Sequence, residues 1–515
     1  MQTQYSFQPD FRPALIPVKS CVNYARYREE LETIDDILRR SGLDEIMIDL
    51  ALQRRRERIP EDQERLCELN PFLRHSLVAW RVRLLVPLLD SRSVRDVEKN
   101  LADSSLHQWF CHIGNFGVVT SPSKSTIDRY KNWYDKDQLQ QAFEILLQKA
   151  AANETHYDAA LEEAVNILGF EMPSDLSEIW FDSTCLKPNI HFPVDWVLLT
   201  NVVRTLMKAV EIIRKHGLKN RMPADGPAAF LKRINQLSIN MANSRRKKDS
   251  KKARKKILRQ IKQLMKTVEK HARKHCELLE TNLMDSDLSE ALAAVVIARI
   301  KGVLEKLPQA IDQAHERIIG ERRVAPEDKL LSLYEPETKV IVRGKSGAEV
   351  EFGNKLLLGE NREGLITCWE LYDEVHNDDK LLEKALRDTS KNTGMPVSLM
   401  CGDRGFANKK MQTLLSEKDP ARKDHIASRS VVEFEAQMKD DGFRESQRRR
   451  SQTEGRIGII KNVFMSGRSL SKGMDSRRQE LSWIMLSHNL RVLASKRIAE
   501  EKARESRRKA LAKTG

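Results

Sequence analysis

Apolar residues recur every three or four positions in several parts of the chain, which is the spacing of an amphipathic helix. In the first 70 residues this pattern predicts a helix over 24–40, after an irregular leader that contains prolines. From 71 to about 165 it predicts a group of shorter helices separated by turns with serine and glycine. Such short helices are compatible with a helix-turn-helix domain that binds DNA, and equally with a plain helical bundle. Both interpretations stay open at this point.

Longer helical patterns follow in the middle of the chain. A first helix is expected to begin with Asp195 as its cap and to stop before Gly217. Apolar stripes over 257–268 and 288–319 predict further long helices. The region is therefore expected to form a helical hairpin or a small bundle.

Strand patterns lie on both sides of these long helices. Ile179, Trp180 and Phe181 are consecutive apolar residues that directly precede Asp182. After the long helices, the pattern predicts strands at 339–342, 348–352, 355–358, 365–371 and 397–401, and helices at 379–387 and 452–497. We therefore expect an α/β fold with a mixed sheet flanked by helices, into which the helical region is inserted after the first strand.

These patterns divide the chain into five expected parts. They are a leader and helix at 1–70, a helical DNA-binding domain with a candidate helix-turn-helix at 71–165, a discontinuous α/β domain at 175–195 and 330–495, an inserted basic helical region at 196–325, and a basic tail at 496–515.

The positive charge of the chain is concentrated in two short segments. The whole chain has 89 Lys and Arg against 74 Asp and Glu, a net charge of +15. Segment 245–274 alone has 15 basic and two acidic residues, and segment 496–513 has eight basic and three acidic residues. Such a distribution indicates a polyanionic partner. Phosphate contacts are favoured for the first segment, whereas the second is compatible with a frayed helix end or with a DNA-binding arm.

Several classes of protein are excluded by composition. The first residues show no basic and apolar secretory signal, and the apolar runs are far shorter than the roughly 20 residues that span a bilayer. The seven cysteines are scattered without a CxxC pair, so neither a zinc ribbon nor a disulfide scaffold is expected. We expect a cytoplasmic protein with no membrane partner.

Three carboxylates stand out by their positions. Asp182 is expected at the end of the first strand, Asp403 at the end of the strand at 397–401, and Glu454 at the start of a helix among arginines. Carboxylates at the ends of adjacent strands converge, and a third from a packed helix would complete a cage of hard oxygen ligands for Mg²⁺. Such a cage can hold two ions about 4 Å apart. Each residue alone is more simply a turn or cap residue, but their joint setting beside basic residues favours a metal site.

With their neighbours, these carboxylates resemble the signature of the DDE transposases of bacterial insertion sequences. Residues 182–184 (Asp-Ser-Thr) match the first acidic position, and residues 403–405 (Asp-Arg-Gly) match the second. Around the third, the family has Tyr, two residues, Arg, three residues, Glu, six residues and Lys. Arg450, Glu454 and Lys461 stand at these spacings.

One position departs from the signature. Gln447 stands where the family has Tyr. This departure affects the role of the Tyr in placing flipped or terminal DNA, but it does not affect metal binding. The resemblance implies an RNase H-like catalytic domain in which Asp182, Asp403 and Glu454 are the catalytic residues and hold two Mg²⁺ (or Mn²⁺) ions. It implies hydrolysis of a phosphodiester at the transposon end, followed by attack of the freed 3′-OH on target DNA.

The resemblance also implies the partners. They are double-stranded DNA, as terminal inverted repeats and as target, and a second copy of the chain, because two transposon ends must be brought together. No nucleotide cofactor is implied, and the location would be the bacterial nucleoid in the cytoplasm. Arg404 would touch DNA or pair with a carboxylate. The expected DNA-binding residues are Arg450, Lys461, Arg404, Arg456, Arg245, Arg246, Lys247, Lys248, Lys251, Lys252, Arg254, Lys255 and Lys256.

Two other functions fit the same residues. The chain could be a transposase-derived DNA-binding or regulatory protein that has lost cleavage, for which the Gln447 departure leaves room. It could also be an RNase H-like nuclease without strand transfer, which only the products, cut or joined DNA, would distinguish.

Overall fold

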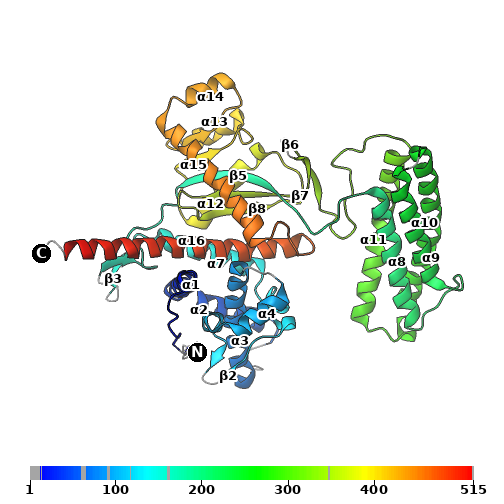
Figure 1. Cartoon of the computed structure of the whole chain (residues 1–515), viewed down its shortest axis with the longest axis horizontal. Helices are drawn as coiled ribbons and strands as arrows, with labels where there is room; N and C mark the ends of the chain where they lie inside the picture. Colours follow the sequence, from blue (N-terminus) through cyan, green and yellow to red (C-terminus); the bar gives the residue numbers. More distant parts are fainter. Residues whose placement is uncertain are drawn as a thin grey trace. The chain divides into compact units, whose positions relative to one another are not determined.

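A computed structural model describes residues 12, 14–59, 65–89, 93–115, 118–158, 163–246, 248–345 and 348–512. The fold is mixed α/β, as expected, with a mixed sheet (Figure 1). The chain divides into two compact units. The first comprises Met1–Leu186, Lys355–Tyr372 and His376–Gly515, and the second Lys187–Asn354 and Asp373–Val375. No helix in the described part of the chain is both long and apolar enough to cross a membrane.

The first unit begins with a group of helices around one apolar core. The helix expected at 24–40 is α1, and the group consists of α1 (Val22–Ser41), α2 (Leu43–Arg56), α3 (Leu66–Leu85), η2 (Val86–Leu88), α4 (Val94–Asp103), α5 (Ser105–Phe110), α6 (Lys124–Tyr130) and α7 (Lys136–Ala151). The side chain of Asp135 caps α7, and Gln138 completes the capping box. The long helix α16 (Met474–Leu511) packs against α1, α3 and α7.

Two short hairpins accompany these helices, and neither was predicted. Strands β1 (Gly114–Asn115) and β2 (Val118–Val119) form one, and β3 (Thr155–Asp158) and β4 (Glu163–Asn166) form the other. Strands of two to four residues leave too few positions for an alternating pattern to be recognised.

The main sheet has the strand order β10-β9-β5-β7-β6, with β8 paired to β7. Its strands are β5 (Glu178–Leu186), β6 (Lys339–Lys345), β7 (Ala348–Glu360), β8 (Ile366–Leu371), β9 (Leu399–Gly402) and β10 (Lys423–Ile426). Strands β5, β9 and β10 are parallel, whereas β7 pairs antiparallel with β6 and β8. The two strands predicted at 348–352 and 355–358 are one continuous strand, β7, and β10 was not predicted.

The two faces of β5 are covered by different helices. Ile179 and Phe181 belong to an apolar cluster with Leu382 and Leu386 of α12 (Leu382–Thr393). The intervening Trp180 points the other way and its Nε1 donates to the carbonyl of Ser446 on α15 (Asp441–Gly458), 3.0 Å away. Because side chains alternate along a strand, the even-numbered residues of β5 face α15. The remaining elements are η5 (Asp378–Lys380), α13 (Lys409–Lys418), α14 (Val431–Gln437) and the π-helical turn η6 (Ile459–Phe464).

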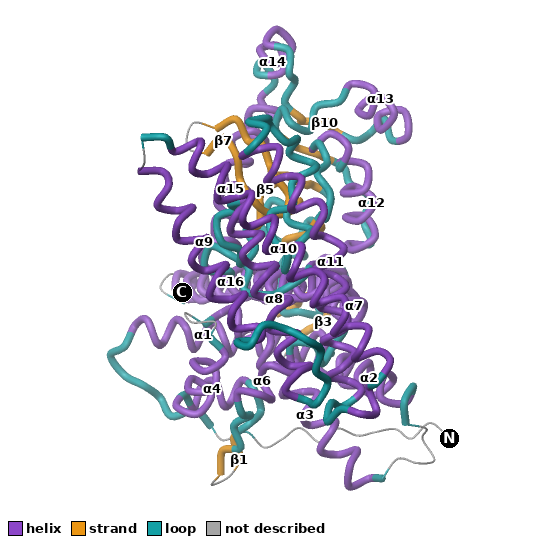
Figure 2. The backbone as a smooth tube through the Cα atoms, turned by 90° about the vertical axis from the view of Figure 1, so that its right-hand side faces the viewer, coloured by secondary structure: helices purple, strands orange, loops and turns teal. Residues whose placement is uncertain are grey.

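The second unit contains a helical bundle with its own apolar core. Its helices are α8 (Asp195–Lys215), α9 (Gly226–Asn243), η3 (Ser244–Arg246), α10 (Ser250–Thr281), η4 (Leu283–Asp285) and α11 (Glu290–Ile318). Figure 2 shows α8, α9, α10 and α11 running alongside one another, and their buried apolar residues form one cluster. The predicted bundle is therefore present, within a unit that extends beyond 196–325 on both sides.

The prediction for Asp195 was wrong. It is the first residue of α8 rather than its cap, and its carboxylate accepts hydrogen bonds from Gln313 Nε2 (2.7 Å) and Arg317 Nη1 (2.8 Å) on α11. The carboxylate joins two helices of the bundle, a long-range contact that a local capping rule does not consider.

Candidate active site

Asp182 lies in the middle of β5 and not at its end, which corrects the sequence prediction. The strand continues to Leu186 because Thr184, Cys185 and Leu186 are also buried in the sheet. Asp182 shares the face of Trp180 and Thr184, which is the face covered by α15. The carboxylate is thus held against a helix at a fixed point of a central strand.

Asp403 lies beside Asp182. In the parallel pair of β5 and β9, Trp180 is opposite Cys401, so two residues further along each chain Asp182 and Asp403 are neighbours. Asp403 follows the last residue of β9, and its Oδ1 accepts a hydrogen bond from the backbone N–H of Gly405, 2.8 Å away. A Cβ atom at Gly405 would lie 2.8 Å from the same oxygen. A side chain at position 405 would therefore displace the Asp403 carboxylate.

Glu454 comes from the covering helix α15. It lies near the C-terminal end of this helix, which begins at Asp441, so the expectation that Glu454 opens a helix was wrong. The Asp440 side chain caps the helix by accepting from the Phe443 N–H. Glu454 Oε1 accepts a hydrogen bond from Arg450 Nη1, 2.9 Å away, and the glutamate side chain is 56% exposed.

The three carboxylates act on one another electrostatically. Burial, which is the largest cause, and the negative charges of Asp403 and Glu454 together raise the pKa of Asp182 to about 6. The hydrogen bond from the Ser183 N–H and the charge of Arg450 act in the opposite direction and lower this pKa. The structure therefore brings together the three predicted acidic residues and Arg450.

The donor set fits a hard divalent cation in its chemistry. It consists of carboxylate oxygens. One of the carboxylates belongs to the half-buried Asp182, which faces two like charges, and a bound cation relieves such an environment. The arrangement is nevertheless open, because no group of three or more His, Cys, Asp or Glu side chains in the described residues is close enough to hold a metal. Glu454 would have to leave Arg450 to join the other two carboxylates.

Gln447, at the position where the signature has Tyr, ties α15 to the strands. Its Nε2 lies 2.7 Å from the carbonyl oxygen of His425, at the end of β10, and 3.3 Å from that of Gly402, at the end of β9. The neighbouring Ser446 Oγ lies 2.7 Å from His425 Nδ1. These contacts fix the helix that carries Glu454 over the strand that leads to Asp403.

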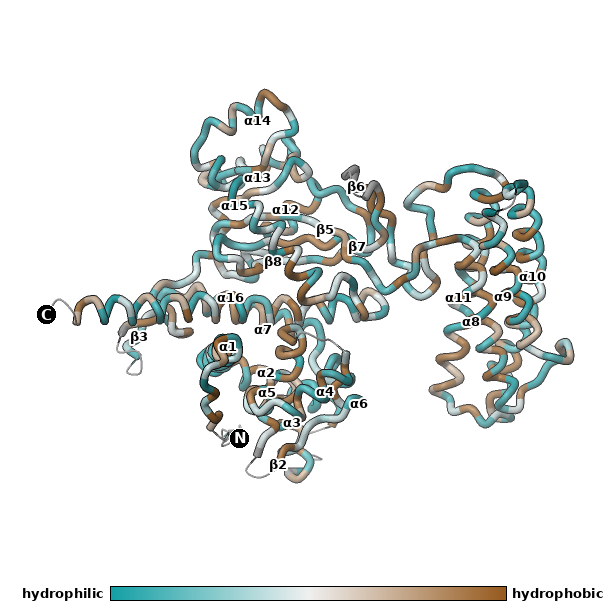
Figure 3. The backbone as a smooth tube through the Cα atoms, viewed as in Figure 1, coloured by the Kyte–Doolittle hydropathy of each residue, from teal (hydrophilic) through white to brown (hydrophobic). Residues whose placement is uncertain are grey.

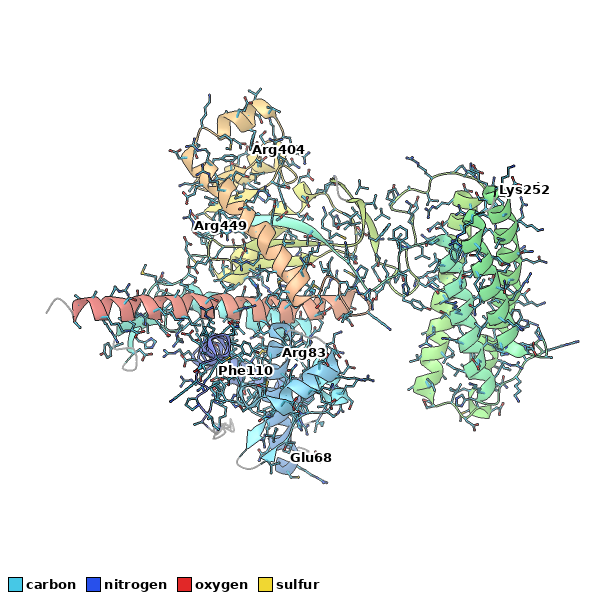
Figure 4. The ribbon with its side chains drawn as sticks, viewed as in Figure 1. Glu68, Arg83, Phe110, Lys252, Arg404 and Arg449 are labelled. Carbon is cyan, nitrogen blue, oxygen red and sulfur yellow. The ribbon has the colours of Figure 1, made fainter. Side chains whose placement is uncertain are left out.

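A buried ion cluster, which sequence reasoning missed, fixes the other side of α15. The carboxylate of Glu360, at the end of β7, is completely buried and accepts from Arg449 Nη1 (2.7 Å), Thr453 Oγ1 (2.8 Å) and Arg456 Nε (3.1 Å). Arg456, expected to bind DNA, is half-buried and is thus paired with a buried carboxylate. Figure 4 shows Arg449 on α15 beside the sheet. Helical spacing could have indicated this division in the sequence, because positions 449, 453 and 456 lie on one side of α15 and positions 450 and 454 on another.

Two further predicted DNA-binding residues lie close to the carboxylates in sequence but make different contacts. Lys461, in the π-helical turn η6, places its Nζ 3.1 Å from Oγ1 of Thr184, on the face of β5 that also carries Asp182. Such π-helical turns are frequent at functional sites. Arg404, labelled in Figure 4, is exposed. Its guanidinium lies 4.5 Å from the ring centre of Phe434 on α14. Its side chain forms no ion pair with a carboxylate of the site in the described residues.

The basic segment forms one side of α10. Ile257, Ile261, Met265 and Val268 are buried against the other helices of the bundle, as the apolar stripe predicted. Figure 3 shows hydrophilic residues at the end of α10 where the basic run begins, and Figure 4 labels Lys252 there. Of the predicted DNA-binding residues, Arg246, Lys248, Lys251, Lys252 and Lys256 are exposed, and Arg254 and Lys255 are half-buried. Lys247 and the side chain of Arg245 lie outside the described residues.

Few acidic groups neutralise this surface. The carboxylate of Glu321 forms ion pairs with Lys251 (2.9 Å) and Lys255 (2.8 Å), and the carboxylate of Glu269 forms one with Arg273 (2.8 Å). The remaining exposed cations of α10 keep a strongly positive field on one side of the bundle.

The basic C-terminal segment is neither frayed nor extended, as far as the structure describes it. It is the last part of α16, which stays helical to Leu511. Arg504 is 4% exposed and donates to Glu171 Oε1 at 2.6 Å, while Arg497 donates to Asp36 Oδ2 at 2.5 Å. Acidic residues of the first unit thus neutralise part of this charge.

Comparison of the chain with protein-family models, with curated proteins and with solved structures gave no match. The interpretation of the site therefore depends on its residues and their geometry alone.

Proposed function

We propose that this chain is a metal-dependent DNA transposase that cleaves DNA at transposon ends and joins them to target DNA. The observation that carries the proposal is the convergence of Asp182, Asp403 and Glu454 from two adjacent parallel strands and one covering helix. Three unrelated turn or cap residues would not be expected to lie close together. The mixed sheet, with β5 at its centre and α15 across one face, supports an RNase H-like core for the same reason.

In this proposal the carboxylates of Asp182, Asp403 and Glu454 hold two Mg²⁺ or Mn²⁺ ions. When bound, the ions activate the attacking oxygen and stabilise the leaving oxygen of a phosphodiester. The protein supplies position and charge rather than a covalent nucleophile. Lys461, held near the site by Thr184, and Arg450, once released from Glu454, neutralise the phosphate at the reacting bond.

The positive side of α10 is the DNA-binding surface of the second unit in this proposal. Its exposed lysines and arginines far outnumber the carboxylates that pair with them. Contacts of this kind act on the phosphate backbone and carry no base specificity. The DNA partner is double-stranded, and a second copy of the chain brings the second transposon end.

One observation favours a second candidate function. Glu454 is paired with Arg450, and the trio does not form a closed metal site in the described residues. A DNA-binding protein of transposase descent that no longer cuts would tolerate such a site. An RNase H-like nuclease without strand transfer is distinguished only by its products.

The deciding experiment incubates the full chain with Mn²⁺ and labelled duplex DNA that carries the inverted repeats flanking its gene. The proposal expects nicks at the repeat ends and joined products with a second duplex, and expects neither with Asp182→Asn. Tight binding without any cut in Mg²⁺ or Mn²⁺ would favour the regulatory protein, and cut but never joined DNA would favour the nuclease.

A further inference from the structure

Arg450 acts on both the helix and the strands of the candidate site. Its Nη1 donates to Glu454 Oε1 on α15 at 2.9 Å. Burial raises the pKa of Asp182 on β5, and the positive charge of Arg450 opposes this rise. Burial also raises the pKa of the Cys401 thiol on β9, and the same charge opposes that rise. The guanidinium thus lies within electrostatic reach of the strand that holds Asp182 and of the strand that leads to Asp403.

This guanidinium supplies the positive charge that a divalent cation would otherwise bring to the carboxylates. It is paired with Glu454, and it partly offsets the repulsion that the other two carboxylates exert on Asp182. A cation held by Asp182 and Asp403 would carry the same sign of charge as the guanidinium and would repel it at short range. The arginine and a metal ion are therefore competitors for Glu454.

Ordinary helix stabilisation does not account for the pair of Arg450 and Glu454. Opposite charges four residues apart stabilise a helix best when the acidic residue comes first, and here the arginine comes first. Arg450 Nε is moreover buried without a hydrogen-bond partner among the described residues. A buried donor without an acceptor is unfavourable. The present conformation therefore leaves part of the hydrogen-bonding capacity of Arg450 unused.

A phosphate of the DNA backbone is the acceptor that suits this arginine better than Glu454 does. A guanidinium binds a phosphate through two parallel hydrogen bonds, whereas Glu454 receives a single one, from Nη1. The Arg450 side chain is 23% exposed, so a backbone phosphate can reach it from solvent. The Glu454 side chain is free of packed neighbours on its exposed side and can turn once the arginine leaves.

We infer that Arg450 is a positioning residue that keeps Glu454 out of the metal site until DNA is bound. A backbone phosphate takes the guanidinium, and Glu454 then turns toward Asp182 and Asp403 and completes the set of metal ligands. Because coupling between two binding sites is reciprocal, metal in the site strengthens DNA binding by the factor by which DNA strengthens metal binding. The inference rests on the proposed function, since it takes the carboxylates as metal ligands and DNA as the partner.

The first test measures metal binding in the absence of DNA. The full chain is titrated with Mn²⁺, and the free ion is followed by its electron paramagnetic resonance signal. Arg450→Gln removes the competing charge, and Arg448→Gln, at an exposed position on the same helix, is the matched control. We expect Arg450→Gln to bind Mn²⁺ about tenfold more tightly than the wild type and the control, within the roughly 5- to 150-fold range typical of coupled sites. Asp182→Asn should abolish this tight binding.

The second test measures the reciprocal effect on DNA. Affinity for a fluorescent duplex is measured by anisotropy in EDTA and in Ca²⁺, a hard cation with the same preference for oxygen ligands, at constant ionic strength. Ca²⁺ should strengthen duplex binding by the wild type and by Arg448→Gln. In Arg450→Gln we expect this strengthening to be at least about fivefold smaller, the lower end of the typical coupling range. A merely structural role of Arg450 would not change the ratio of the two affinities.

Equal Mn²⁺ affinity of the wild type and Arg450→Gln without DNA would overturn the inference. Weaker binding by a folded Arg450→Gln would also overturn it, because the arginine would then support the ligands. If this variant does not fold, the wild type decides, since a Ca²⁺ effect on duplex affinity that is the same in Asp182→Asn contradicts the coupling.

These outcomes are separate from those of the proposed function. A wild type that never cuts DNA, while Arg450→Gln binds Mn²⁺ more tightly, removes the transposase and keeps the competition between arginine and metal. A wild type that cuts and joins DNA, with equal Mn²⁺ affinity in the two chains, does the reverse.

Discussion

Arg450 and Glu454 form an ion pair across one turn of α15, with 2.9 Å between Nη1 and Oε1. The same glutamate acts electrostatically on Asp182 in β5, which lies beside Asp403. In the proposed function, Glu454 thus has two competing partners: the arginine on its own helix and a cation that the two aspartates would hold. The Glu454 side chain is 56% exposed, so it can change rotamer without a clash with packed neighbours.

Replacement of Glu454 by glutamine tests its assignment as a ligand. Glu454→Gln keeps the size of the side chain but lacks the charge, so we expect metal-dependent nicking to fall by more than the roughly 10- to 100-fold that loss of a residue beside metal ligands costs. DNA binding in EDTA should change little. Glu445→Gln, an exposed position on the same helix, is the control and should cut normally. Normal nicking by Glu454→Gln would remove this residue from the site.

The raised pKa of Asp182 predicts a pH dependence of stability. The pKa is about 6 in the folded chain, because of burial and then of the neighbouring carboxylates, and about 3.9 in the unfolded chain. Between these values the folded state binds more protons, so this group lowers stability as pH rises from about 4 to 6. Asp182→Asn removes the effect. We expect its melting temperature to exceed that of the wild type by more at pH 7.5 than at pH 5.

Metal binding at the same carboxylate should show the matching proton linkage. A cation requires ionised Asp182, so the apparent affinity for Mn²⁺ should fall about tenfold per pH unit below pH 6 and level off above it. Stabilisation of the wild type by Mn²⁺ at several pH values measures this. A pH-independent stabilisation, or the same stabilisation in Asp182→Asn, would place the ion elsewhere.

The buried cluster around Glu360 predicts a contrast between two neighbouring arginines. Arg449 donates to the fully buried Glu360 carboxylate, whereas Arg448 is exposed. Arg449→Ala leaves a buried charge with fewer partners and should destabilise the first unit by about 3–5 kcal/mol. Arg448→Ala should cost about 0.5 kcal/mol or less. Urea denaturation of both variants gives the comparison, and similar losses would contradict the cluster.

Functional residues that are related by local spacing could be predicted from the sequence. Contacts between residues far apart in the chain could not. The pattern Arg450, Glu454, Lys461 was visible because these positions follow one another on α15 and η6. The partner Glu360 was not, since no local pattern links it with Arg449. Asp182 was placed at a strand end because polar residues follow it, yet Thr184 and Cys185 are both buried. Strand β10, four residues long with three polar side chains, lacked an apolar pattern altogether.

We predict a structural role for Gln447, which stands where the signature has Tyr. Its amide bridges the carbonyl groups of Gly402 and His425. Gln447→Leu leaves these buried acceptors with fewer donors and should destabilise the chain by about 1–3 kcal/mol. Gln452→Leu, an exposed position on the same helix, should have little effect in the same urea denaturation. Equal stability of the two variants would show that the amide does not hold α15 to the strands.

The positive side of α10 predicts the salt dependence of DNA binding. Lys252, Lys256, Arg259, Lys266 and Lys270 are exposed on this helix, and their joint change to glutamine removes up to five phosphate contacts without touching the buried stripe. The slope of log K against log[salt] for duplex binding should then fall by about 0.9 for each lost contact. Arg299→Gln/Lys306→Gln on α11 should leave it unchanged. An unaltered slope in the fivefold variant would mean that α10 faces solvent or protein in the complex. The positive charge would then serve another partner.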